Sequence, residues 1–172
     1  HTTQSLASFA APSKAIDVLS PGVQTSVQDW PGRLGYWDVG VPPSGPMDGL
    51  ALRLANRLLG NPEGAAALEI TVAGPALRFR SAQQIAVTGA PIELLLDGAS
   101  VPMGRVLVVL AGQTLRVGRV TGAGCRAYLA VSGGLDVPVY LGSRSTFTLG
   151  QFGGHGGRVL RAGDVLHAGL SA

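Results

Sequence analysis

The sequence predicts a mainly β domain with one main helix, at about residues 46–59, and long loops rich in glycine and proline. Three observations lead to this prediction. Short apolar segments with β-branched residues follow one another along most of the chain, and each is broken by Gly or Pro. One stretch has apolar residues at clear helical spacing. Asp97-Gly98 separates two apolar segments, as the turn of a β-hairpin would.

The expected strands have lengths and spacings that are typical of a barrel or a sandwich. They are residues 15–19, 23–27, 67–72, 76–80, 84–88, 92–96, 99–101, 106–110, 113–120 and 125–131. Residues 1–14, rich in Ser, Thr and Ala, are typical of a linker, so the folded unit is expected at 15–172. The 46% hydrophobic content of the 172 residues is sufficient for one domain with its own core.

The predicted helix has signals at both ends. Ser44 or Gly45 is expected as the N-cap, Pro46 suits the first helical position, and Asp48 suits the first turn. Gly60-Asn61-Pro62 is expected to end the helix. Between these ends, the apolar residues at helical spacing are Leu50, Ala51, Leu54, Ala55, Leu58 and Leu59.

The composition suggests that part of the surface is covered by something else. Charged residues make up 13% of the chain, about half the usual share, and the mean hydropathy is +0.32. An Ala/Gly-rich composition would give similar values without any covered surface, so both interpretations stay open. The net charge of +3 comes mainly from isolated arginines without a basic run, which does not support nucleic-acid binding.

Cysteine, histidine and hydropathy patterns narrow the class of protein. Cys125 is the single cysteine, which excludes an internal disulfide and a multi-cysteine metal site. Its apolar neighbours predict a reduced thiol in the core, which fits a cytoplasmic protein. His1, His155 and His167 are too scattered to suggest a metal cluster. No apolar run approaches the roughly 18 residues of a membrane span, so none is expected.

Residues 28–48 are expected to form a long ordered loop around which the rest of the chain is organised. They hold both tryptophans of the protein and several of its prolines, glycines and acids. Loops of this length in a compact domain are usually functional or disordered, and the aromatic residues argue against disorder.

Two aspartates bracket this loop and are the candidate catalytic carboxylates. Asp29 and Asp48 could converge on one pocket; the alternatives are a turn-stabilising side chain and a carboxylate favoured by the helix dipole, respectively. Arg33 and Arg144 are candidate clamps for an anion or a carbonyl group, although a lone Arg is more often a surface residue. Tyr36 is typical of a core or rim aromatic.

The glycine-rich segment 150–157 is a second candidate site. Its amides could wrap an anion, and His155 could donate or relay a proton. A flexible crossing and an exposed bystander histidine are the alternatives. Phosphate-loop, dinucleotide-binding, nucleophile-elbow and His-Glu-x-x-His patterns do not occur, which argues against nucleotide binding, serine-hydrolase and zinc-protease chemistry in this segment.

Several segments in combination resemble one protein family. They are residues 26–33, 40–48, 52–56, 60–62, 127–131, 133–134 and 142–146. With them the chain resembles the family named for allophanate hydrolase subunit 2, which includes the carboxyltransferase domain of biotin-dependent urea carboxylase and the C subunit of 5-oxoprolinase. Residues 28–33 and 148–157 look most like the urea carboxylase members.

The resemblance implies a fold similar to a cyclophilin-like β-barrel and an ATP- and biotin-dependent ligase reaction. The carboxyl group of carboxybiotin would pass to urea and give allophanate, as in urea degradation. Family members are about twice as long here as a typical single domain, so residues 15–172 would be the first half of the carboxyltransferase domain and inactive alone. Biotin and ATP would be held elsewhere, on biotin carrier and biotin carboxylase domains, which are expected partners beside the remainder of the carboxyltransferase domain.

This chemistry needs acceptors for the N–H groups of urea and donors for an oxygen. The expected site residues are, for catalysis, Asp29 and Asp48, and for substrate binding, Arg33, Tyr36, Ser44, Arg144, Ser145 and His155. No metal is expected. A 5-oxoprolinase component, a guanidine-type carboxylase and a non-catalytic docking module are the alternatives, because a one-group change in a small pocket can decide the substrate.

Overall fold

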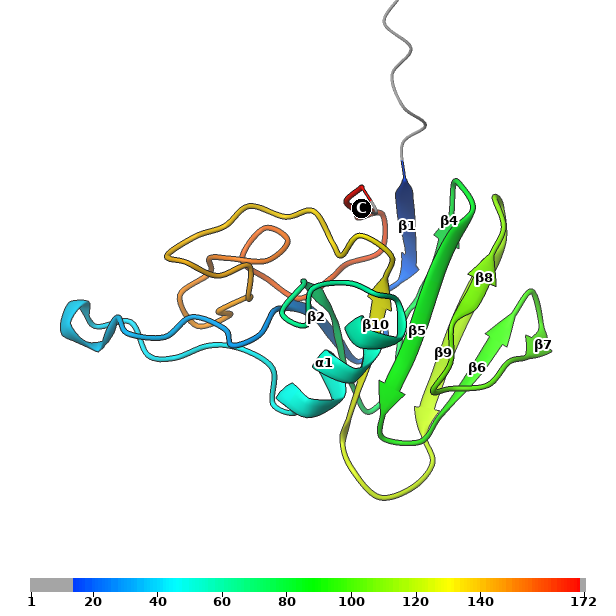
Figure 1. The fold of residues 1–172 in the computed structure, drawn as a ribbon, viewed down its shortest axis with the longest axis horizontal. Coiled ribbons are helices and arrows are strands. Elements are labelled where there is room, and N and C mark those ends of the chain that lie inside the picture. Colours follow the sequence, from blue (N-terminus) through cyan, green and yellow to red (C-terminus); the bar gives the residue numbers. More distant parts are fainter. Residues whose placement is uncertain (1–13, 171–172) are drawn as a thin grey trace, which may run out of the picture.

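The computed structural model describes residues 14–170, which form two antiparallel β-sheets and one α-helix (Figure 1). Except for Lys14, the predicted linker at 1–14 lies outside the described residues. The first sheet has six strands in the order β11–β1–β4–β9–β6–β7, and the second has five in the order β2–β3–β10–β5–β8. The prediction of a mainly β fold with one main helix is confirmed.

Ten of the eleven strands within residues 14–170 match the expected segments closely, and β11 is not among those segments. The strands are β1 (Ala15–Ser20), β2 (Gln24–Gln28), β3 (Ala67–Thr71), β4 (Ala76–Phe79), β5 (Gln83–Gly89), β6 (Ile92–Leu96), β7 (Ala99–Ser100), β8 (Leu107–Val109), β9 (Thr114–Val120), β10 (Arg126–Val131) and β11 (Val165–His167). Asp97 and Gly98, both with positive φ, form the two-residue turn between β6 and β7 that the hairpin signal predicts.

The two sheets do not close into the expected cyclophilin-like barrel. Within residues 14–170 each sheet has its own ladders. Two isolated bridges join their extensions: Leu135 with Ala168, beyond β10 and β11, and Ala73 with Arg119, between the end of β3 and β9. At this crossing Val72 has a left-handed φ of 63° and Pro75 has no N–H to donate, so the chain turns away from one sheet before pairing with the other. The result is two stacked layers.

Alternate strand residues fill the space between the layers. In the first sheet Leu77 lies between Val18 and Leu115, and in the second Leu129 lies between Leu68 and Val87. These residues belong to one continuous apolar core. Burial of this apolar surface is the main stabilising term for such a fold.

The helix α1 (Gly49–Leu58) packs on the second sheet through β5 and β10 (Figure 1). It starts three residues later than expected, and its N-cap is Asp48, so the prediction of Ser44 or Gly45 as cap is wrong. Residues 44–48 are kept out of the helix because Ser44 pairs with Arg33 and because the Met47 N–H binds a carboxylate on β3. The helix end at Leu58 agrees with the predicted stop.

Two long segments form the rest of the molecule on the side away from the six-stranded sheet (Figure 1). One is residues 29–48 of the loop predicted at 28–48, with the short 3-10 helix η1 (Trp37–Val39); Gln28 itself ends β2. The other is residues 132–164. Within the described part of the chain, no helix is long and apolar enough to cross a membrane.

Candidate functional site

Asp29 joins the two long segments. Its carboxylate accepts hydrogen bonds from Ser143 Oγ at 2.5 Å, from the Arg144 N–H at 2.7 Å and from Ser145 Oγ at 2.8 Å. The Asp29 N–H donates back to Ser145 Oγ at 3.0 Å. Both carboxylate oxygens are therefore used within the protein, and Asp29 fixes the 143–145 segment against the end of β2.

Arg33 is the largest of the fully buried side chains, at 1% exposure. Its guanidinium donates to four oxygens, which are Tyr140 O at 3.0 Å, Ser44 Oγ at 2.7 Å, Ser143 O at 3.3 Å and Ser145 O at 3.1 Å. It also lies over the ring of Phe152, 5.0 Å from the centroid. Burial lowers the pKa of Arg33, and the nearby Asp29 carboxylate partly opposes that shift. Arg33 thus acts inside the protein as a strut between the two segments.

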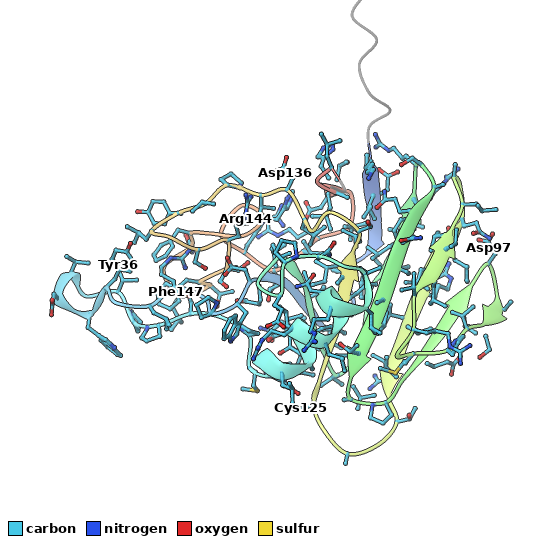
Figure 2. All side chains as sticks on the ribbon, in the orientation of Figure 1. Tyr36, Asp97, Cys125, Asp136, Arg144 and Phe147 are labelled. Atoms are coloured by element: carbon cyan, nitrogen blue, oxygen red, sulfur yellow. The ribbon has the colours of Figure 1, made fainter. Side chains whose placement is uncertain are left out.

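Beyond this strut, residues 34–42 project as an arm. Arg33 and Ser44 pair at its base, with backbone bonds of 2.6 and 3.1 Å. Tyr36 lies half-buried in the arm, where Figure 2 labels it far from the sheets, and the Tyr36 carbonyl accepts from the Val39 and Val41 N–H groups. The predicted substrate residues Tyr36 and Ser44 are thus both part of the arm and its base.

The other predicted residues, Arg144, Ser145 and His155, lie in segment 132–164 and contact groups of the protein itself. Arg144 donates to the Val137 carbonyl and lies 3.7 Å from the Asp136 carboxylate, near it in Figure 2. Ser145 is fully buried in the contact with Asp29. His155 Nε2 lies 3.7 Å from Asp164 Oδ1.

Asp164 also binds Arg158 through two bonds of 2.8 Å. The bonded guanidinium lowers the pKa of the Asp164 carboxyl to about 2, although partial burial opposes this, so Asp164 is ionised across the neutral range. Within residues 14–170, no group of three or more His, Cys, Asp or Glu side chains is arranged to hold a metal ion.

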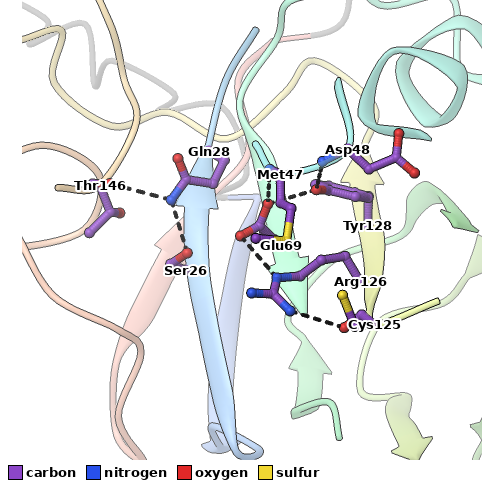
Figure 3. A network of polar contacts seen from close by, with 9 residues as sticks. All are labelled: Ser26, Gln28, Met47, Asp48, Glu69, Cys125, Arg126, Tyr128 and Thr146. Atoms are coloured by element: carbon purple, nitrogen blue, oxygen red, sulfur yellow. Dashed lines mark hydrogen bonds and ion pairs between the residues drawn. The ribbon is translucent and has the colours of Figure 1, made fainter. Parts of the chain in front are cut away.

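Asp48 belongs to a different polar network, at the start of the helix (Figure 3). Its carboxylate caps the helix by accepting from the Ala51 N–H at 3.0 Å, and its own N–H donates to the Tyr128 hydroxyl at 2.8 Å. Tyr128 donates in turn to Glu69 Oε2 at 2.6 Å, and the Met47 N–H donates to the same oxygen at 2.8 Å. Glu69 and Tyr128 are direct neighbours across β3 and β10. Together they hold the segment that leads into the helix on the sheet.

The hydroxyl of Tyr128 stays protonated in this network. Burial raises the pKa of the Tyr128 hydroxyl far above its ordinary value, and the hydrogen bond to Glu69 adds to the shift. Tyr128 therefore remains protonated, and so a hydrogen-bond donor, throughout the neutral pH range. Arg126 Nε lies 3.6 Å from Glu69 Oε1 and has no hydrogen-bond partner, although it is buried.

A pocket of about 400 Å³ opens beside this network. It is lined by Met47, Asp48, Gly89, Ala90, Ala123, Gly124, Cys125 and Arg126. Cys125 is exposed at this pocket, so the prediction of a core thiol is wrong. The cause is its place: Cys125 precedes β10 and follows a loop, and the buried apolar residues start at Ala127.

The structure thus separates residues that the sequence suggested might share one pocket. Asp29 joins Arg33, Ser44, Arg144 and Ser145 in one network, whereas Asp48 lines a pocket that contains none of them. The sequence analysis missed Glu69, Tyr128 and Arg126. Alternation within the strands 67–71 and 126–131 places these polar side chains on the face opposite Leu68 and Leu129, and that pattern could have drawn attention to them.

Most of the chain matches one known protein family. Residues 39–172 match the family described as carboxyltransferase domain, subdomain A and B. The chain belongs to this family. The matched range includes the helix, the long segment 132–164 and the whole polar network around Asp48.

Individual relatives are similar over nearly the whole chain. Urea amidolyase of Saccharomyces cerevisiae is 51% identical over 165 residues, which are 96% of this chain and 9% of that protein. The 5-oxoprolinase C subunit of Escherichia coli is 42% identical over 91% of this chain and 50% of that protein. The crystal structure of Kluyveromyces lactis urea carboxylase superposes with a TM-score of 0.87 at 53% identity, over 94% of this chain and 14% of that one. The chain spans half or less of the length of each.

Proposed function

We propose that this chain is part of the carboxyltransferase domain of a urea carboxylase, which transfers a carboxyl group from carboxybiotin to urea and gives allophanate. The observation that carries the proposal is the similarity to urea amidolyase, 51% identity over 96% of the chain. The C subunit of 5-oxoprolinase is less similar, at 42% over 91%. A difference of this size over the same region favours the urea enzymes.

The reaction sets clear requirements for a site. Biotin, carried on another domain, supplies the activated carboxyl group. A urea nitrogen would form a bond to the carboxyl carbon while the bond from that carbon to the biotin ring nitrogen breaks. The urea nitrogen would lose one proton and the released ring nitrogen would gain one, so a base or a carboxylate acceptor must face the urea N–H group. The urea oxygen needs a donor.

Among the described residues, the pocket at the helix start offers both kinds of group. The Asp48 carboxylate can accept from an N–H group while it caps the helix, and the Arg126 guanidinium can donate to a carbonyl oxygen. Arg126 Nε is buried beside Glu69, so the terminal nitrogens of the guanidinium would be the donors. Because urea and the ring of biotin share the N–CO–N group, the donor set fits either one, and at about 400 Å³ the pocket exceeds what urea alone fills.

The remaining predicted residues are assigned to positioning in this proposal. Asp29, Arg33, Ser44 and Ser145 have their polar groups engaged with each other, so they would act by fixing the arm and the 143–145 segment. Direct contact of these residues, or of Tyr36, Arg144 and His155, with the substrate stays a prediction.

The remainder of the carboxyltransferase domain is the proposed partner of the arm. Leu34, Trp37 and Val39 are 53%, 67% and 71% exposed, which is unusual for three large apolar residues within six positions. Relatives extend well beyond the matched region, and in the proposed enzyme such additional polypeptide would cover these three residues. This would account for the low share of charged residues. Biotin carboxylase and biotin carrier domains, with ATP used at the former, complete the proposed assembly.

Substrate-dependent ATP turnover by the complete enzyme tests the proposal. Turnover should rise with urea and not with 5-oxoproline or with a guanidine compound. The 5-oxoprolinase alternative, carried by the 42% identity, requires the opposite preference. A docking module without catalytic function would require that Asp48→Asn and Arg126→Gln leave turnover unchanged while the domains still assemble.

A further inference from the structure

A second pocket, of about 450 Å³, lies between the start of β2 and the glycine-rich segment. It is lined by Gln24, Thr148, Gln151, Gly156, Gly157, Arg158, Val159 and Arg161. It shares no residue with the pocket at Asp48, and the proposed carboxyl transfer makes no use of it. Two arginines and three side chains that can donate a hydrogen bond thus surround one space.

Arg158 is held in a fixed orientation at this pocket. Its guanidinium makes two 2.8 Å bonds to Asp164 and donates to the Val159 carbonyl at 2.9 Å. Asp164 is largely buried, with 10% of its side chain exposed, and Arg158 keeps it ionised. A guanidinium fixed in this way needs little reorganisation when a ligand arrives.

Arg161 provides the second cation. Its N–H donates to Asp164 at 2.8 Å, which fixes the backbone, while its side chain is exposed and has no ion pair within residues 14–170. The Asp164 carboxylate therefore pairs with the guanidinium of Arg158, and the guanidinium of Arg161 adds a second positive charge to the lining of the pocket. One positive charge is left over at the pocket, with His155 as a further titratable neighbour of Asp164.

The glycines keep the space beside Arg158 open. Gly156 has a φ of +67°, and a Cβ at this position would point to within 3.8 Å of Arg158 Nε. Gly157 has a φ of +70°, and a Cβ there would lie 2.2 Å from the Gln151 carbonyl oxygen. A chain with side chains at these two positions could not form the turn without strain. A side chain at position 156 would also reduce the space beside the guanidinium of Arg158.

We propose that this pocket binds a small oxyanion, of the carboxylate or phosphate type, between Arg158 and Arg161. Guanidinium groups bind planar or tetrahedral oxyanions through paired N–H donors. Gln24, Gln151 and Thr148 supply neutral donors around the same space. The sequence of the glycine-rich segment suggests an anion bound by backbone amides. In this proposal the anion is bound beside the same segment, by side chains.

Thermal unfolding of this chain at constant ionic strength tests the proposal. Inorganic phosphate and acetate are added in separate series, and chloride replaces them in the reference series. A ligand that binds the folded state raises Tm in a concentration-dependent way, from which the Kd follows. We expect a rise with at least one of the two anions, and the comparison between them identifies the ligand type.

Arg161→Ala is the decisive variant because its side chain makes no contact on which the fold depends. It should weaken anion binding by about tenfold or more, the loss expected for one charge-assisted contact. Arg116→Ala, which removes an exposed arginine of β9 far along the other sheet, is the matched control and should bind as the unchanged protein does. Equal Tm rises in all three proteins, or no rise beyond the chloride reference, would overturn the proposal.

Discussion

The Asp29 carboxylate accepts a 2.5 Å hydrogen bond from the hydroxyl of Ser143, 114 positions further along the chain. Together with the bonds to Arg144 N–H and Ser145 Oγ, it connects two long loops that have no strand ladder between them. The relative position of these loops thus depends on side-chain hydrogen bonds, whereas backbone ladders hold the strands of each sheet together.

Asp29→Asn should therefore destabilise the chain. The amide group keeps one acceptor oxygen and places an NH₂ group against donors, so at least one hydroxyl or N–H loses its partner. We expect a loss of about 3 kcal/mol in the free energy of unfolding, measured with guanidinium chloride. Asp38→Asn, on exposed η1, is the control and should change it by less than about 0.5 kcal/mol. Equal stability of the two variants would show that Asp29 does not hold the loops.

Arg33→Lys should be nearly as harmful as Arg33→Met. Lysine keeps the charge, but a single nitrogen cannot reach four oxygens around a buried planar group. The Tyr140 and Ser143 carbonyls keep backbone donors, whereas the buried Ser145 carbonyl loses its donor. Each variant should lose about 3 kcal/mol or more in guanidinium chloride unfolding. Arg57→Lys, at an arginine whose side chain is 70% exposed, is the control. A fully stable Arg33→Lys protein would contradict the role of the guanidinium as a strut.

The strands could be predicted from the sequence because strand patterns are local. Alternating apolar residues such as Leu77 and Leu129, together with the Asp97-Gly98 turn, identify strands without knowledge of their partners. The helix start was placed too early because the local signals at Ser44 and Pro46 compete with distant contacts. Arg33 and Glu69 hold residues 44–47 in place, and neither contact can be read from nearby residues.

The candidate site could be predicted only in part, because its contacts also join residues that are far apart in the sequence. Asp29, Arg33 and Asp48 stand out by composition, but composition does not show which contacts they make. The partners Tyr128 and Glu69 come from strands where polar residues look like ordinary surface positions. They belong to the site because they accept hydrogen bonds from the Met47 and Asp48 N–H groups, which lie in another segment. Such long-range pairing is absent from local patterns.

Tyr128→Phe tests that network. The Asp48 N–H loses its acceptor and Glu69 loses one donor, while the ring packing is retained. We expect a loss of about 2 kcal/mol in stability and faster amide hydrogen exchange in the first turn of α1. Tyr140→Phe serves as the control, because the Tyr140 ring contacts Phe152 and its half-exposed hydroxyl makes no hydrogen bond within residues 14–170. Unchanged exchange at Ala51 and Leu52 in Tyr128→Phe would count against the network.

The Arg158–Asp164 pair predicts a specific acid dependence. The pKa of Asp164 is lowered from 3.8 to about 2 in the folded protein, so the folded state favours the ionised form. Its contribution to stability is present above about pH 4 and is lost as the pH falls through about 2. Carboxyl titration by NMR should show the low pKa in the unchanged protein and a return toward 3.8 in Arg158→Met. Arg80→Met, which removes the partner of Asp17, should leave Asp164 unaffected.

The proposed cover of the arm gives the last prediction. Trp37 should be oxidised readily by hydroxyl radicals in this chain, where 67% of it is exposed, and should be protected in the complete carboxylase. An aromatic anchor at the centre of an interface typically contributes more than about 2 kcal/mol, so Trp37→Ser should separate the domains or loosen them measurably. Val23→Ser removes a residue that is 60% exposed in the turn between β1 and β2, and it serves as the control.

The kinetic consequence of Trp37→Ser distinguishes docking from a direct role in chemistry. In the complete enzyme, the biotin carboxylation step should continue at its usual rate, because the proposed function assigns it to another domain. Transfer to urea should fall if the remainder of the domain completes the proposed site. Equal radical reactivity of Trp37 in the chain and in the complete enzyme would mean that the arm stays exposed and that its apolar residues serve another contact.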